Sequence, residues 1–387
     1  MKRIATDPIR PPGEAGSILP GPPRDCRWNR RDFLKSSAIA AGALAMGRAL
    51  GAETPASPGG GVLPRSIHPY PNRVAWGAGT LTLSGRATLA VGGDLDETVI
   101  GMMGDTWERF TSGAMGLVVT EDAAIKGCGF SLGGARPPEL SQGAEYALRV
   151  DASGASAGAR DASGARHAWF TLLQLMDADD AADGSLGFTL PHVEIQDWPA
   201  LRFRGLHLCI FPETRPLMIE KAIRLAAVFK FTHVVLEFWG MLRLDALKEL
   251  AWPQAWGKED AGRLVEIARG MGLEVIPMFN CWGHAAASRI RHGRHVVLDQ
   301  NPRLAPLFEP DGWTWCLTNP RAQALIRAVC DELMRFAGPG GYFHIGCDEA
   351  YSHATCDRCR ATDRVELFAD HVNGMAAHIE ARGRRAI

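Results

Sequence analysis

The sequence lacks an excess of charge of either sign, and beyond its first residues it lacks an apolar run long enough to cross a membrane. The 387 residues include 42 Lys and Arg and 43 Asp and Glu, which leaves a net charge of -1. This balance gives no sign of the basic surface that nucleic-acid binding requires, so we predict no nucleic-acid partner. Charged residues make up 22% and hydrophobic residues 46%, as in a folded globular chain and unlike a disordered one.

Residues 1–52 are predicted to be an export signal that takes no part in the fold. Asn29–Lys35 reads N-R-R-D-F-L-K, the pattern of a twin-arginine signal, and an apolar stretch (Ser37–Met46) and a small-residue cleavage region (Ala49–Ala52) follow it. The apolar stretch is too short to span a bilayer. We therefore expect export to the periplasm or beyond, with no membrane span after cleavage. The alternative is a chance Arg-Arg pair before an alanine-rich helix.

After a Pro/Gly linker over residues 53–62, residues 63–198 are predicted to form a small α+β domain. Strand-like alternation bounded by Gly and Asp occurs at Thr80–Leu83, Ala87–Val91 and Tyr146–Val150. Helices are expected over Glu121–Lys126 and Ala168–Met176. The low-complexity segment Asp151–Arg166 is interpreted as a hairpin or surface loop.

Residues 199–387 alternate four times between a short apolar strand and a helix. The predicted strands are Phe203–Phe211, Thr232–Phe238, Leu273–Phe279 and Tyr342–Cys347, and the helices are Leu217–Phe229, Asp260–Met271, Arg321–Phe336 and Arg364–Arg382. Such alternation predicts a parallel sheet with right-handed crossovers. A (β/α)8 barrel, which takes about 250 residues, and an open doubly wound sheet both remain possible.

Polar side chains cluster where these strands end: Glu237, Asn280, His284, Asp348 and Glu349. The adjacent carboxyl groups of Asp348 and Glu349 attract most interest. Like charges held close together raise one pKa, which suits a general acid near neutral pH. Taken alone, the pair is as well explained by a helix cap.

The residues around the pair resemble sequence motifs of glycoside hydrolase family 20. His344–Glu349 (H-I-G-C-D-E) resembles that family's H-x-G-G/C-D-E signature, Asp197–Gly205 its D-x-P-x-F-x-x-R-G stretch, and Glu274–Ala285 its third barrel strand. These motifs occur in the family's order, and their sequences look closest to those of the hexosaminidase D-like branch. The resemblance implies a (β/α)8 TIM-type barrel preceded by a small α+β domain. Only the first four to five strand units of the barrel are expected in residues 199–387, so the chain looks truncated within it.

The resemblance also implies a β-N-acetylhexosaminidase that acts on an amino-sugar oligosaccharide or glycoconjugate, with neither cofactor nor metal. In this family the substrate's own acetamido oxygen is the nucleophile. Glu349 would be the acid and then the base, and Asp348 would orient the acetamido group. Arg204 would bind ring hydroxyls, His284 would position the acid, and Glu237 would supply the carboxylate of that network.

Four positions depart from the family pattern. Cys209, Met278 and Asn280 stand where the family has acidic residues, and Trp282 stands where it has a proline. These departures, together with the expected lack of later strands, favour two alternatives to an active enzyme. One is a non-catalytic carbohydrate-binding relative, and the other is an inactive fragment.

The motif Cys356-Asp-Arg-Cys359 allows three readings: half of a zinc site, a local disulfide, or two free thiols. His353 and a distant cysteine are the expected partners for a metal. A metal-dependent hydrolase, with His344, Asp348 and Cys356 at one ion, is the least favoured function.

Several aromatic side chains near the motifs have two interpretations. Trp313 and Trp315 either stack on a sugar or pack between barrel and loop. His207 and His344 are expected to be hydrogen-bonded core histidines.

Overall fold

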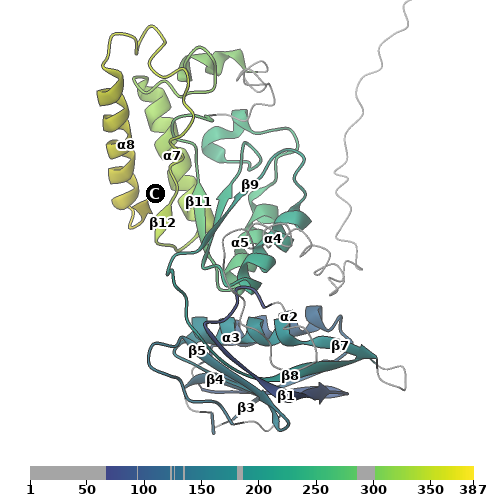
Figure 1. Ribbon diagram of the computed structural model, residues 1–387. Helices are drawn as coiled ribbons and strands as arrows, with labels where there is room; N and C mark the ends of the chain where they lie inside the picture. The colour runs from purple at the N-terminus through teal and green to yellow at the C-terminus, as the bar shows by residue number, and fades with distance from the viewer. Residues whose placement is uncertain are drawn as a thin grey trace, which may run out of the picture.

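The computed structural model describes residues 67–93, 95–122, 124–125, 127–133, 136–180, 186–285 and 301–387. The predicted export signal (residues 1–52) and linker (residues 53–62) lie outside these ranges. Figure 1 shows a strand-rich unit, with helices α2 and α3 on one face of its sheet, below a second unit built from alternating strands and helices. Across the described ranges, none of the helices has the length and apolarity needed to cross a membrane.

The first unit contains β1 (Arg73–Leu83), β2 (Arg86–Val91), α2 (Glu97–Phe110), β3 (Gly116–Glu121), β4 (Cys128–Gly133), β5 (Tyr146–Asp151), β6 (Gly154–Ala159), α3 (Ala162–Leu175), β7 (Asp177–Asp180) and β8 (Leu186–Asp197). The second contains β9 (Gly205–Cys209), α4 (Pro216–Val228), β10 (His233–Glu237), the 3-10 helix η2 (Asp245–Leu250), α5 (Lys258–Gly270), β11 (Glu274–Met278), the 3-10 helix η3 (Pro302–Leu307), α7 (Pro320–Ala337), β12 (Tyr342–Phe343), α8 (Arg364–Glu380) and β13 (Arg385–Ala386).

The first unit is one sheet covered on one face by α2 and α3. Its strand order is β1-β8-β5-β6-β4-β2-β3, with β7 paired to β8, and every pair except β2–β3 is antiparallel. Large aromatic side chains fill the layer between helices and sheet: Trp107 and Trp169 pack at 6.0 Å, and Phe130 meets Trp169 edge-on at 5.3 Å. Trp169 Nε1 donates to Thr106 Oγ1 at 2.8 Å, so its one polar group is satisfied in the core.

The helix predicted over Glu121–Lys126 is wrong. Glu121 is the last residue of β3, and Asp122 then forms a turn in which its carboxylate accepts a hydrogen bond from Ala124 N at 2.8 Å. An aspartate side chain that bonds to the backbone two residues on competes with helix formation. The segment therefore forms a turn and not a helix.

The low-complexity segment Asp151–Arg166 is a hairpin, as one of its interpretations had it, but it is not a surface loop. Its small residues form β6, which lies between β5 and β4 and is largely buried, and then begin α3, capped by Asp161. A Cβ on Gly164 would lie 2.6 Å from Glu145 O, so small residues let α3 approach the sheet closely. Small buried residues leave no hydrophobic periodicity for sequence analysis to detect.

The second unit confirms the four predicted strand–helix pairs. β9, β10 and β11 are parallel neighbours in that order, and β12 pairs with β13 in parallel. Phe279 N donates to His344 O at 3.1 Å and Cys281 N donates to Ile345 O at 2.9 Å, which joins the chain after β12 to the edge of β11. The strands thus follow one another in sequence order with no reversal. A doubly wound sheet reverses its order, so this arrangement is the beginning of a barrel.

A buried ion pair joins the two units. Lys230, in the turn between α4 and β10, places its Nζ 2.9 Å from Asp197 Oδ2 at the end of β8 and 2.8 Å from the Tyr146 hydroxyl. Asp197 also accepts two hydrogen bonds from Asn72. Burial raises the pKa of Asp197, but the charge of Lys230 and these hydrogen bonds outweigh it, so the pKa is lowered. The carboxylate therefore stays ionised inside the junction.

Removing the cation should test this junction. Lys230→Met leaves Asp197 buried without its counter-ion, so we expect the free energy of unfolding to fall by about 3 kcal/mol. Urea unfolding followed by tryptophan fluorescence measures it. Arg263→Met is the control, because Arg263 forms an exposed pair with Glu259 at 3.8 Å and should cost less than about 1 kcal/mol. Equal losses in the two variants would contradict the structural role of the buried pair.

Candidate active site

The Asp348-Glu349 pair follows β12 where the chain makes a sharp turn. Gly346 has φ +51°, and Glu349 itself has φ +48°, a left-handed conformation that is uncommon outside glycine. Across from this turn, a Cβ on Gly283 would lie 2.0 Å from Asp348 O, so only glycine fits there. A strained backbone held by close packing is typical of functional sites. The turn thus presents both carboxyl groups, each more than half exposed, at the C-terminal edge of the sheet.

His284 lies against both carboxyl groups. Its Nε2 is 3.1 Å from Glu349 Oε2 and 3.5 Å from Asp348 Oδ2. The ring is enclosed by two indoles, with centroids 4.4 Å from Trp313 and 5.0 Å from Trp239. Trp313 Nε1 also donates to the backbone oxygen of Glu349 at 2.8 Å. The structure therefore brings together Asp348, Glu349 and His284, as predicted, and adds Trp313 as a support for the acid's backbone.

Glu237 lies nearby but does not hydrogen-bond to His284 in the part of the chain that the structure describes. Its carboxylate accepts hydrogen bonds from His207 Nε2 at 2.9 Å, Cys209 Sγ at 2.9 Å, Asn280 Nδ2 at 2.5 Å and Trp239 Nε1. Burial raises the pKa of Glu237, but these donors outweigh it and lower the pKa overall. The indole of Trp239, which packs on His284, is the link between Glu237 and the carboxyl pair.

The structure does not bring Arg204 to the site. This residue precedes Gly205, the first residue of β9, whereas Cys209, at the other end of the strand, is level with Glu237. At about 3.3 Å per residue, Arg204 is roughly 16 Å from that end. Its guanidinium donates to Lys230 O at 2.6 Å and Leu201 O at 2.5 Å. The prediction that Arg204 holds ring hydroxyls is therefore wrong, because its side chain belongs to the junction between the units.

Two family models match the chain. The model of glycosyl hydrolase family 20, domain 2, matches residues 65–198, and the model of the family 20 catalytic domain matches residues 229–387. The chain belongs to glycoside hydrolase family 20.

Curated relatives in family 20 are distant in sequence. A "Beta-hexosaminidase" of Porphyromonas gingivalis is 27% identical over 276 residues, which is 62% of this chain and 35% of that protein. "Hexosaminidase D" of Bos taurus is 23% identical over 156 residues, 38% of this chain and 43% of that protein. The chain therefore spans between about a third and a half of these relatives, and membership of the hexosaminidase D-like branch stays a prediction.

Solved structures confirm the expected fold class, a (β/α)8 TIM-type barrel preceded by a smaller α/β domain. The family 20 exo-β-N-acetylglucosaminidase of Vibrio harveyi, solved with N-acetylglucosamine, has a TM-score of 0.64 at 19% identity and covers 83% of this chain and 54% of that one. The N-acetyl-β-hexosaminidase of Streptomyces plicatus has a TM-score of 0.61 at 20% identity, over 83% of this chain and 64% of that one.

Three of the four residues that depart from the family 20 pattern have hydrogen-bond or packing partners that account for them. Cys209 and Asn280, which replace acidic residues, both donate hydrogen bonds to Glu237. The Glu237 carboxylate is therefore surrounded by hydrogen-bond donors. Acidic residues at positions 209 and 280 would instead repel it. Trp282, in place of a proline, packs at 4.3 Å on Phe368 and donates to His353 Nδ1 at 3.1 Å.

The remaining aromatic predictions divide between packing and the site. Trp315 is fully buried, stacks on Phe308 at 4.5 Å and donates to Asn280 O, so the packing interpretation is confirmed. His344 Nδ1 accepts a hydrogen bond from Gly346 N at 3.1 Å, which ties its ring to the turn that precedes the carboxyl pair. His207 bonds to Glu237 as expected, but its side chain is 42% exposed, so the prediction that it is a core histidine is wrong. Sequence reasoning missed Trp239, although its place just after β10 and Glu237 could have indicated it.

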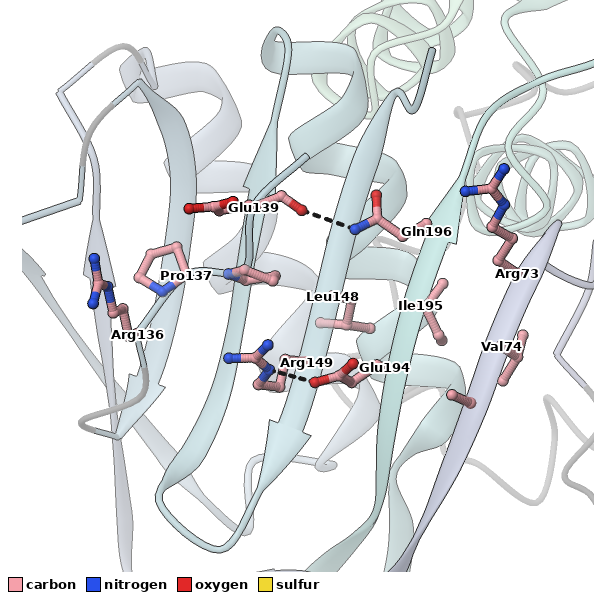
Figure 2. A pocket seen from close by; sticks show the side chains of 12 residues that line it. Arg73, Val74, Arg136, Pro137, Glu139, Leu148, Arg149, Glu194, Ile195 and Gln196 are labelled. Atoms are coloured by element: carbon pink, nitrogen blue, oxygen red, sulfur yellow. Dashed lines mark hydrogen bonds and ion pairs between the residues drawn. The ribbon is translucent and has the colours of Figure 1, made fainter. Parts of the chain in front are cut away.

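A hollow of about 600 Å³ lies elsewhere, on the sheet of the first unit (Figure 2). Its lining includes the Arg149–Glu194 ion pair (2.9 Å) and Gln196, which donates to Glu139 O at 2.8 Å. These polar groups are already paired on an open sheet face. The hollow is unconnected with the carboxyl pair after β12, so we assign it no part in the chemistry.

Gly283 offers a direct test of how the site is held. In Gly283→Ala the new methyl group displaces the backbone of Asp348, and a misplacement on the order of 1 Å should lower kcat/KM about 100-fold. Steady-state kinetics on a chromogenic substrate measure the effect. Gly262→Ala, in α5 with open space around it, is the matched control and should leave kcat/KM unchanged. A Gly283→Ala enzyme as active as that control would contradict the close approach.

Proposed function

We propose that the protein is an exo-acting β-N-acetylhexosaminidase that releases terminal β-linked N-acetylglucosamine or N-acetylgalactosamine. The observation that carries this proposal is the contact of His284 with both members of the Asp348-Glu349 pair, at the C-terminal edge of a family 20 sheet. Barrel enzymes place their catalytic groups at that edge. The names of the relatives support the same substrate class.

The chemistry proposed is hydrolysis with retention, assisted by the substrate. The 2-acetamido oxygen attacks the anomeric carbon while Glu349 donates its proton to the leaving oxygen, and an oxazolinium ion forms. Asp348 accepts the acetamido N–H and stabilises the positive charge on that nitrogen. Water then attacks the anomeric carbon and opens the oxazolinium ring. Glu349, now ionised, takes a proton from this water and so returns to its acid form.

His284 is proposed as a positioning residue for this reaction. Its Nε2 lies within reach of both carboxylates, so a proton on that nitrogen holds the two side chains in one relative orientation. Trp239 and Trp313 keep the imidazole in place by packing on it. Groups held this way lose little freedom on binding substrate, which favours the reactive geometry.

A second candidate is a carbohydrate-binding relative without turnover. One observation favours it: the only arginine predicted to hold ring hydroxyls lies at the opposite end of β9, among the residues that the structure describes. The same carboxyl pair would then bind an acetamido sugar without cleaving it.

The gene product assayed at full length on a chromogenic β-N-acetylglucosaminide decides between the two. We expect release of chromophore, a fall of about 10²–10⁴-fold in kcat for Glu349→Gln, and inhibition by a thiazoline analogue of the intermediate. Glu259→Gln, at an exposed position on α5, is the control and should retain full activity. Sugar binding without release by the wild type would overturn the enzyme and support the second candidate.

We propose also that residues 1–52 direct export through the twin-arginine pathway, to the periplasm or beyond. The order of Arg30, Arg31, Phe33, Leu34 and Lys35 supports this. Replacing both Arg30 and Arg31 with Lys should leave the uncleaved protein in the cytoplasm, as measured by cell fractionation and immunoblotting. The paired change Arg24→Lys and Arg27→Lys should leave export intact, and equal export of the two variants would contradict the signal.

A further inference from the structure

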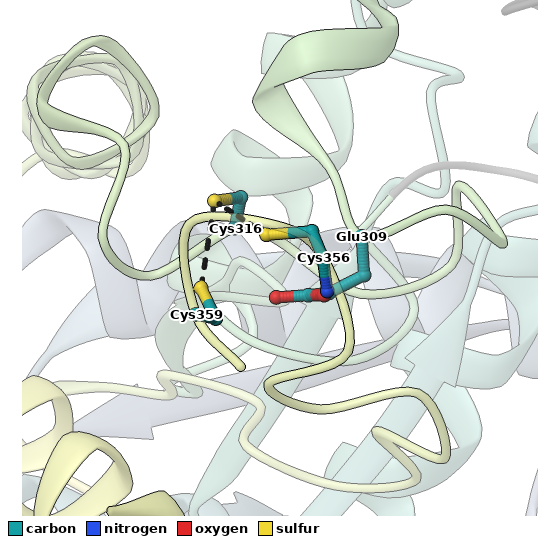
Figure 3. A group of neighbouring side chains, drawn as sticks. All are labelled: Glu309, Cys316, Cys356 and Cys359. Carbon is teal, nitrogen blue, oxygen red and sulfur yellow. Dashed lines mark hydrogen bonds between the residues drawn. The ribbon is translucent and has the colours of Figure 1, made fainter. Parts of the chain in front are cut away.

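The two cysteines of the C-x-x-C motif meet a third cysteine from a distant part of the chain. Cys316 Sγ lies 3.5 Å from Cys356 Sγ and 3.6 Å from Cys359 Sγ. Figure 3 shows the three thiols facing one another, with the Glu309 carboxylate beside them. One ligand atom from each of these four residues lies within 4.8 Å of every other. His353, an expected partner, is not part of this group, because its ring nitrogens bond to Trp282 and to Arg364 O.

The distances suit a tetrahedral metal better than a disulfide. Zinc–sulfur bonds of about 2.3 Å at tetrahedral angles place two sulfur atoms about 3.8 Å apart. A disulfide requires about 2.05 Å, and one disulfide among three cysteines would leave a thiol over. The observed separations are within a few tenths of an ångström of the tetrahedral value, and the three sulfurs share one centre.

Glu309 has the character of a fourth ligand. The residue is only 2% exposed, and its Oε2 accepts hydrogen bonds from Thr355 N at 2.9 Å and Cys356 N at 2.6 Å. Its Oε1 is buried and has no hydrogen-bond partner among the described residues. A buried carboxylate oxygen without a partner is costly, so an ion at this point would satisfy it. The hydrogen bonds to Oε2 orient the carboxylate in the way that metal ligands are usually supported.

We propose that Cys316, Cys356, Cys359 and Glu309 bind a structural zinc ion. Three thiolates and one carboxylate form a closed set of four protein ligands, as structural zinc sites require. Thr318 Oγ1, 3.2 Å from Cys359 Sγ, adds a hydrogen bond to the ligand shell. The least favoured sequence hypothesis, a catalytic metal held by His344, Asp348 and Cys356, receives no support, since the close-lying ligand groups among the described residues do not include that set.

The ion would join the two loops that carry the carboxyl pair and its support. Glu309 and Cys316 flank Trp313 in the loop before α7, while Cys356 and Cys359 follow Glu349 in the loop before α8. These loops already touch through the bond from Trp313 Nε1 to Glu349 O. Zinc would link the two loops a second time, because two of its ligands come from each loop. Its function is therefore positioning and not chemistry.

Metal content of the full-length gene product, purified without chelator, tests the site directly. We expect one zinc per chain by plasma mass spectrometry, and less than about 0.1 in Cys316→Ser and Cys359→Ser. Cys128→Ser, which removes a buried thiol in the first unit, should keep one zinc. Replacing zinc with cobalt(II) should produce cobalt–thiolate charge-transfer absorption in the wild type and in Cys128→Ser. These readouts do not depend on glycoside hydrolysis, so they can fail or succeed independently of the proposed activity.

Glu309→Gln keeps all three thiols and the size of the side chain, which covers the case in which the serine variants do not fold. We expect its zinc dissociation constant to rise at least about 10-fold, measured by competition with a chromogenic chelator. An unchanged constant would overturn the four-residue site. Wild-type protein that neither contains nor takes up zinc, and that shows two fewer thiols than its cysteine count under denaturing conditions, would overturn the metal and show a disulfide instead.

Discussion

The buried ion pair between Lys230 and Asp197 is the contact that holds the two units against each other. Asp197 ends the last long strand of the first unit, and Lys230 stands just before the second barrel strand. Arg224, on α4, adds a second tie to Asp105 of α2 at 2.7 Å. Arg204 bonds to the backbone of Lys230 and so closes the same junction. The placement of β9 and β10 against the first sheet therefore rests on a buried ion pair, supported by a second pair that is partly exposed.

At the C-terminal edge of the barrel strands, the acidic side chains lie in two separate places. The Glu237 carboxylate lies among three hydrogen-bond donors, which are His207, Cys209 and Asn280. The two carboxyl groups of Asp348 and Glu349 are placed apart from it, on a turn beside His284. This separation leaves the Asp348-Glu349 pair open to solvent, while Glu237 accepts a hydrogen bond from Trp239, whose indole packs on the imidazole of His284.

How much the sequence could predict depended on the type of signal. Short continuous apolar runs predicted the parallel strands of the second unit, and apolar residues at helical spacing predicted its helices, because burial on both faces or on one face imposes these patterns. The same signal failed at Asp151–Arg166, where buried alanine, glycine and serine carry no contrast. Arg204 was misassigned although its place at the start of the predicted strand Phe203–Phe211, and not at its end, put it at the edge opposite the carboxyl pair. Cys316 could not be linked to the C-x-x-C motif, since only the fold brings positions forty residues apart together.

The close approach of Gly283 to Asp348 has a consequence for how the protein folds. Residues 283 and 348 meet only after α7 has returned the chain to the edge of β11, a contact between segments well separated in sequence. Contacts of this kind close large loops, and the chain entropy lost in closing a loop slows folding. The carboxyl pair therefore has its geometry only when the chain after β12 is joined to the edge of β11, and not merely when the flanking helices are formed.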